Sequence, residues 1–265
     1  MAIDYSIDYD CVPKQTFGTD EIIERLKGRE RAELIIRMYR DQDDMRPPSE
    51  MGFEFTRSTP QGQEETTLIV VQDLLDQAAE LERVAHHCAG CPANRLGRPF
   101  GCCGFIQYPL SGAGEAWLLN QLPTPDDALV WLLLKRGVED FQYDGANIAH
   151  LRRSAAIYFE DQQAPVRRLG EFSINADQLF EMLFAVGDIV PNHAGVLLLF
   201  LHAIPRDLQA DEIMGISPAK EDAETRYPFR YQAQAEDDVT TSELKEFLHA
   251  LYTAWRLNVP LRIDA

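Results

Sequence analysis

Residues 83–109 read R-V-A-H-H-C-A-G-C-P-A-N-R-L-G-R-P-F-G-C-C-G-F-I-Q-Y-P, and the interpretation of the whole chain starts from them. This stretch holds four of the 5 cysteines and two of the 6 histidines. It contains no Asp or Glu, although the chain as a whole has 43 of them. Clustered thiols and imidazoles at short spacing favour a metal-binding loop.

The composition around this loop is that of a globular protein. With 265 residues, 45% hydrophobic and 9% aromatic residues, the chain is long enough to bury a substantial core. The formal net charge is −18, so the surface repels phosphate backbones and nucleic acid is an unlikely partner. A protein partner is compatible with this charge, but the sequence selects none.

The chain shows neither a signal peptide nor a membrane span. Its first residues, M-A-I-D-Y-S-I-D-Y-D, lack the basic start and apolar centre of a secretion signal. The longest apolar run, at 196–204 and interrupted by His202, falls well short of the ~20 residues that a spanning helix needs. We therefore expect a soluble, cytoplasmic protein, in which thiols stay reduced and clustered cysteines bind metal more often than they form disulfides.

The pattern of apolar residues predicts a mixture of strands and helices. Residues 1–12 alternate apolar and polar side chains, as a strand does, and the tail after Asn258 could form a last strand. A helix at 73–87 delivers His86, His87 and Cys88 into the metal loop. Further helices are predicted at 20–40 (with Gly28 as a possible break), 112–122, 124–137, 145–153, 175–187, 191–204 and 240–255.

Two β-hairpins, each followed by a helix, are expected. The first pairs 52–57 with 65–71 around the turn residues 58–63, and the second pairs 156–160 with 166–174. The predicted fold class is therefore α+β, with two β-hairpin-plus-helix units, additional helices and a metal-binding cysteine loop. We expect one domain over 1–265. It could divide into a subdomain 1–120, which contains the loop 83–109, and a helix-rich subdomain 121–265 with a hairpin.

Three cysteines of the loop have the spacing of metal ligands. Cys88 and Cys91 form a C-x-x-C pair, in which a tight turn lets two thiolates reach one ion. Gly90 lies at the position where such a turn often needs unusual backbone angles. Cys102 is far enough along the chain to fold back as a third ligand, and adjacent cysteines rarely both bind one ion. We favour Cys102 over Cys103 for that role.

The fourth ligand is open from the sequence alone. Cys11, which follows the first predicted strand, would complete a four-thiolate site and is our preferred ligand. His86 and His87 are alternatives, although His87 adjoins Cys88 and neighbouring side chains do not readily converge on one ion. Cys103 is a further alternative. The predicted ligand set is thus Cys11, Cys88, Cys91 and Cys102.

Zinc is the predicted ion, because closed sites of three or four cysteines usually hold zinc in a structural role. An iron–sulfur cluster also uses four cysteines and is the alternative cofactor. The sequence contains no H-E-x-x-H, G-x-S-x-G or P-loop pattern that would indicate catalysis. We therefore predict a metal-binding protein with a non-catalytic or regulatory role. The alternatives are a metalloenzyme with an open zinc site and an iron–sulfur or thiol redox protein.

Overall fold

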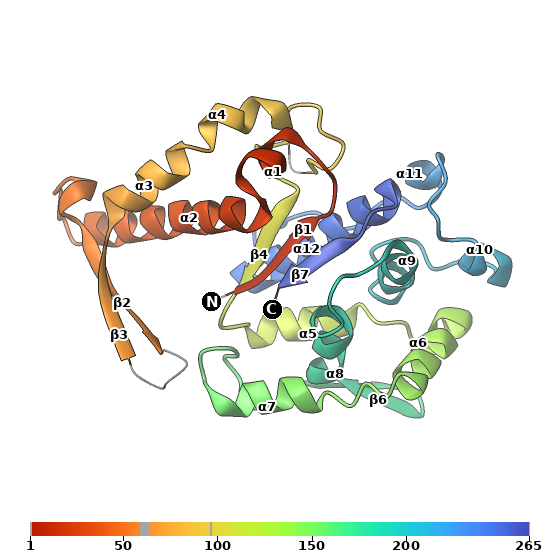
Figure 1. Ribbon diagram of the computed structural model, residues 1–265. Coiled ribbons are helices and arrows are strands. Elements are labelled where there is room, and N and C mark those ends of the chain that lie inside the picture. The colour runs from red at the N-terminus through yellow and green to blue at the C-terminus, as the bar shows by residue number, and fades with distance from the viewer. Residues whose placement is uncertain (1, 59–63, 96, 265) are drawn as a thin grey trace. The chain divides into compact units, whose positions relative to one another are not determined.

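A computed structural model describes residues 2–58, 64–95 and 97–264, and its chain divides into two compact units. One unit is formed by the N-terminal residues up to Tyr9 together with Gly101–Ala265, and the other by Asp10–Phe100. These boundaries differ from the division at residue 120 that we considered from the sequence. The mixture of helices and strands in Figure 1 agrees with the predicted α+β class.

The first unit contains most of the secondary structure. Its strands are β1 (Ala2–Ile7), β4 (Cys103–Gln107), β5 (Val166–Leu169), β6 (Phe172–Asn175) and β7 (Leu261–Asp264). Its helices are α5 (Gly112–Asn120), α6 (Ala128–Asp140), α7 (Ala146–Ser154), α8 (Ala176–Phe184), α9 (Pro191–Phe200), α10 (Ala210–Met214), α11 (Ala223–Arg226) and α12 (Val239–Leu257).

The second unit is mainly helical with one hairpin. It contains the helices α1 (Val12–Phe17), α2 (Thr19–Asp41), α3 (Val71–Ala79) and α4 (Glu82–Ala85), the short 3₁₀ turns η1 (Pro48–Glu50) and η2 (His86–Cys88), and the strands β2 (Gly52–Ser58) and β3 (Glu64–Val70).

An antiparallel sheet of strand order β4-β1-β7 and the helix α12 form the centre of the first unit. In the sheet, Ile3 lies opposite Ile106 and Tyr5 lies opposite Ile263. Helix α12 packs against all three strands and also against α5 and α9 (Figure 1). Most side chains of α12 are buried, including Trp255 at 0% exposure. Its burial explains why this helix is long and regular.

Both predicted terminal strands, β1 and β7, are present. The pairing of β1 with β4 shows where the chain leaves the first unit and where it returns. The N–H of Ile7 donates to the carbonyl of Cys102 at 2.9 Å, and Ser6 pairs with Cys103. The end of β1 and the start of β4 are therefore neighbours in one sheet. The chain leaves this sheet after β1, forms the second unit over residues 10–100, and returns as β4.

In the second unit, α2 packs along α3 and continues through Gly28 without a break. A Cβ at Gly28 would lie 3.6 Å from a methyl group of Leu74, an ordinary van der Waals contact, so α3 packs directly beside this position. Ala32, Met51 and Val71 are buried beside these helices. The predicted first hairpin is confirmed as β2–β3; most of its predicted turn, residues 59–63, lies outside the described residues.

Three local predictions are corrected by the structure. Residues 166–169 pair with 172–175 around the left-handed Gly170, instead of with 156–160. Helix α6 starts after Asp127 instead of Thr124, and it continues past Gly137 to Asp140. The predicted helix 73–87 is divided into α3, α4 and η2. By contrast, the capping box that we expect from Asn175 and Gln178 at the start of α8 is confirmed.

A buried ion cluster connects three helices of the first unit. Arg152 of α7 is 2% exposed and contacts Glu115 of α5 at 0% and Asp177 of α8 at 5%. Its Nη1 also donates to the carbonyl of Asp161 at 2.9 Å, and its guanidinium lies over the ring of Phe159. Burial raises the pKa of Glu115, and Arg152 opposes this shift in part.

Among the helices of the described ranges, none combines the length and the apolar character that a membrane span requires.

A half-buried arginine, Arg206, joins the C-terminal ends of α5 and α9. Arg206 donates to the carbonyl of Leu199 at 2.7 Å and also to the carbonyls of Phe200 and Gln121. His202 follows α9 in a left-handed conformation with φ of 53°. Burial, followed by the charge of Arg206, lowers the pKa of His202 to about 4.

Candidate metal centre

Cys88 and Cys91 lie on a tight turn at the end of η2, as their spacing predicts. The N–H of Cys91 donates to the carbonyl of Cys88 at 3.3 Å, and the N–H of Asn94 donates to the carbonyl of Cys91 at 2.9 Å. Gly90 has φ of 74°, a left-handed conformation that glycine adopts without strain. The turn therefore holds both thiols on one short segment of the second unit.

Cys11 belongs to the same unit and reaches this turn through helix packing. It is the N-cap residue of α1, with φ of −154° and ψ of 159°, and its carbonyl accepts from the N–H of Gln15 at 3.0 Å. Helix α1 packs against α4 and η2. Residues that are far apart in the sequence, Cys11 and the Cys88–Cys91 turn, thus come together.

The Cys88 thiol is buried and receives a backbone hydrogen bond. Its side chain is among the buried residues at 6% exposure, and the N–H of Phe100 donates to its Sγ at 3.3 Å. Burial raises the pKa of Cys88, the bond from Phe100 lowers it, and the thiols of Cys11 and Cys91 raise it further. A thiol whose proton is retained mainly because it is buried would still be converted to thiolate by a bound cation.

Cys102 and Cys103 belong to the first unit, at the start of β4. Both side chains are buried, and their Sγ atoms lie 3.9 Å apart. All five cysteines are in the thiol form. The membership of Cys102 in the ligand set, and our preference for it over Cys103, stay predictions.

The histidines of the loop are arranged differently from the cysteines. His86 and His87 are both exposed, and their rings are tilted by 39° with centroids 3.9 Å apart. In the part of the chain that the structure describes, no three His, Cys, Asp or Glu side chains form a group that could hold a metal ion. A metal at Cys11, Cys88 and Cys91 would therefore require these side chains to close around it.

Sequence reasoning missed the backbone donor at Phe100 and the buried cluster of Arg152, Glu115 and Asp177. No side-chain pattern reports a main-chain N–H, so Phe100 had no signal in the sequence. The ion cluster brings together charges from three helices that are separate in the chain, and each charge taken alone resembles a solvated residue.

Comparison of the chain with protein-family models, with curated proteins and with solved structures found no match in any of the three. The function must therefore be argued from the residues and their surroundings.

Proposed function

We propose that the chain binds one zinc ion in a structural role, through the thiolates of Cys11, Cys88 and Cys91, with Cys102 as the fourth ligand predicted from the sequence. The observation that supports this is the packing of α1 against η2, which brings Cys11 to the Cys88–Cys91 turn. A C-x-x-C turn joined by a distant cysteine is a common way to build a closed zinc site.

The electrostatics of the three thiols favour a cation among them. Neighbouring thiolates repel one another, and zinc offsets this repulsion by binding each sulfur at about 2.3 Å, which places the sulfurs about 3.8 Å apart in a tetrahedral site. The loop supplies Arg83, Arg95 and Arg98 and no carboxylate, so it does not add to the negative charge. The N–H of Phe100 already points at one sulfur and would stabilise it as a thiolate.

A structural role follows from the position of Cys11. Helix α1 has six residues, too few to be stable in water without tertiary contacts. A metal bond to its N-cap residue would fix this helix against α4 and η2. The proposal assumes a reducing, cytoplasmic environment, as predicted from the sequence, in which the thiols remain available to the metal.

Elemental analysis and an absorption spectrum of the purified protein test the proposal. We expect one zinc per chain and no visible absorption band. Cys11→Ser, Cys88→Ser and Cys91→Ser should each lose most of the zinc. Cys103→Ser is the matched control, since it removes a buried thiol of the same loop that is outside the proposed ligand set.

Each contrary result has a defined meaning. Absence of zinc, together with rapid alkylation of all thiols in the folded protein, would refute the proposal. A visible band with bound iron would replace it by the iron–sulfur alternative. If Cys102→Ser keeps its zinc while the other three variants lose it, a fourth position is left open, and the metalloenzyme alternative gains support.

A further inference from the structure

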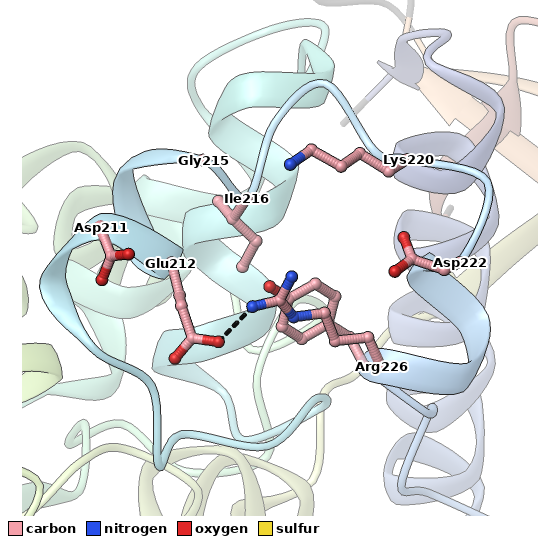
Figure 2. Close-up of a pocket in the computed structure, with 8 residues that line it drawn as sticks. Asp211, Glu212, Gly215, Ile216, Lys220, Asp222 and Arg226 are labelled. Carbon is pink, nitrogen blue, oxygen red and sulfur yellow. Dashed lines mark hydrogen bonds and ion pairs between the residues drawn. The ribbon is translucent and has the colours of Figure 1, made fainter.

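A pocket of about 130 Å³ opens in the first unit, away from the cysteines, where the chain passes from α10 to α11 (Figure 2). The volume is about four times the share of liquid volume that one water molecule occupies. The pocket is lined by Asp211, Glu212, Gly215, Ile216, Lys220, Asp222, Arg226 and Tyr227.

The floor of the pocket is apolar and is fixed to the core. Ile216 and Tyr227 are buried. The carbonyl of Ile216 accepts a hydrogen bond from Nε1 of Trp255 at 3.0 Å, and that of Tyr227 accepts one from the hydroxyl of Tyr252 at 2.9 Å. Both donors belong to α12, so a largely buried helix of the unit positions the floor.

The wall of the pocket is fixed in the same way. Asn258, which follows α12, exchanges two side-chain hydrogen bonds with the backbone of Ala219, at 3.1 and 3.2 Å. Glu212 accepts from the N–H of Gln209 at 2.8 Å and forms an ion pair with Arg226 across the pocket. These bonds hold an irregular segment in one shape before any ligand arrives, which lowers the entropy that binding must overcome.

Charged side chains of both signs surround this floor. Within the described residues, no hydrogen bond or ion pair uses the Lys220 ammonium or the side-chain carboxylates of Asp211 and Asp222. Figure 2 shows the Lys220 ammonium on the side of Ile216 and the Asp222 carboxylate on the opposite side. The guanidinium of Arg226 is bound to Glu212.

This arrangement discriminates between classes of small ligand. A purely anionic ligand would meet three carboxylates against two cations, and a purely cationic ligand would meet Lys220 and Arg226. A zwitterion can place its carboxylate near Lys220 and Arg226 and its ammonium near Asp222. Its apolar part would lie on Ile216 and Tyr227.

We propose that this pocket binds a small zwitterion of the α-amino acid class. The ammonium and the carboxylate of the ligand are recognised by Asp222 and Lys220, and the apolar floor accommodates a short side chain. Binding at this site is independent of the proposed zinc centre.

Isothermal titration of the full chain with the twenty amino acids tests the proposal. At least one amino acid should bind with a dissociation constant below 1 mM. Its N-acetyl derivative, which lacks the ammonium, and its amide, which lacks the carboxylate, should each bind at least tenfold more weakly. The proposal is overturned if no amino acid binds below 1 mM, or if either derivative binds as well as the parent.

Substitutions then place the ligand in the pocket. Lys220→Met and Asp222→Asn should each weaken binding at least tenfold. Lys135→Met and Glu221→Gln are matched controls, because they make the same charge changes at residues that do not line the pocket. Circular dichroism checks that each variant is folded. Unchanged affinity in folded Lys220→Met and Asp222→Asn, or an equal loss in the controls, would assign binding elsewhere and reject this site.

Discussion

Replacement of Arg152 by methionine should destabilise the protein strongly. Methionine keeps much of the aliphatic length but removes the guanidinium that contacts Glu115 and Asp177, the carbonyl of Asp161 and the ring of Phe159. Two carboxylates would then remain buried without their cation. Breaking a buried ion pair by removing one partner typically costs about 3–5 kcal/mol, and we expect a loss in that range at pH 7.

The loss should depend on pH in a defined direction. Burial already raises the pKa of Glu115 above its unfolded value, and without Arg152 it should rise further. For a carboxyl group with a raised pKa, the folded state binds more protons than the unfolded state, so stability increases as the pH falls toward the unfolded pKa. The difference between Arg152→Met and the unchanged protein should therefore shrink from pH 7 to pH 5.

Urea denaturation followed by circular dichroism at the two pH values measures this difference. Arg153→Met is the matched control, because Arg153 follows on the same helix and its side chain is exposed; it should change stability by no more than about 0.5 kcal/mol. Adding Glu115→Gln and Asp177→Asn to Arg152→Met should recover part of the loss. A loss below about 1 kcal/mol for Arg152→Met, or one that grows at pH 5, would refute this account of the cluster.

Two further predictions concern single residues. Gly104→Ala should destabilise the protein by about 1–3 kcal/mol in urea denaturation, because the new Cβ would lie 2.5 Å from Cζ of the buried Tyr5. Gly137→Ala should instead stabilise the protein by about 0.5–1 kcal/mol, because Gly137 lies inside α6 and a Cβ there would meet nothing within 4 Å. A loss at both glycines would contradict the steric argument. His202 has a folded pKa of about 4, below the usual 6.5, so the unfolded state binds its proton first and stability falls as the pH drops through that window. His202→Asn, which tolerates the left-handed backbone, should gain stability relative to the unchanged protein between pH 6.5 and 4; parallel pH profiles would contradict this prediction.

The sequence predicts those features that depend on local patterns. The first strand follows from the alternation of residues 1–12, and the capping box of Asn175 and Gln178 is confirmed because both residues act on the same helix end. The Cys88–Cys91 turn is local as well, since its geometry depends on Gly90 and on hydrogen bonds between neighbours.

Features that depend on tertiary packing were less accessible. Gly28 resembles a break in a helix, but α3 packs against it and the helix continues. The partner of 166–169 depends on Gly170, whose left-handed backbone permits a tighter turn than the one we expected. Likewise, nothing local indicates that β1 and β4 are neighbours in a sheet, and so the sequence does not reveal that residues 10–100 form a unit of their own.

Because residues 10–100 form a unit inserted between β1 and β4, Cys11 is the proposed ligand whose loss should affect stability most. Cys11 lies near the first end of the unit 10–100, and Cys88 and Cys91 lie near its last end. A cross-link between such positions closes a loop of about 80 residues, and chain-entropy arguments give such a closure about 4.5 kcal/mol of stabilisation. Because whole domains are stable by only about 5–15 kcal/mol, a zinc ion at these thiols would supply a large part of the stability of this unit. Loss of Cys11 should therefore affect the fold of the unit as well as its metal content, whereas Ala89→Ser, an exposed change within the turn that leaves both sulfurs and Gly90 in place, should affect neither.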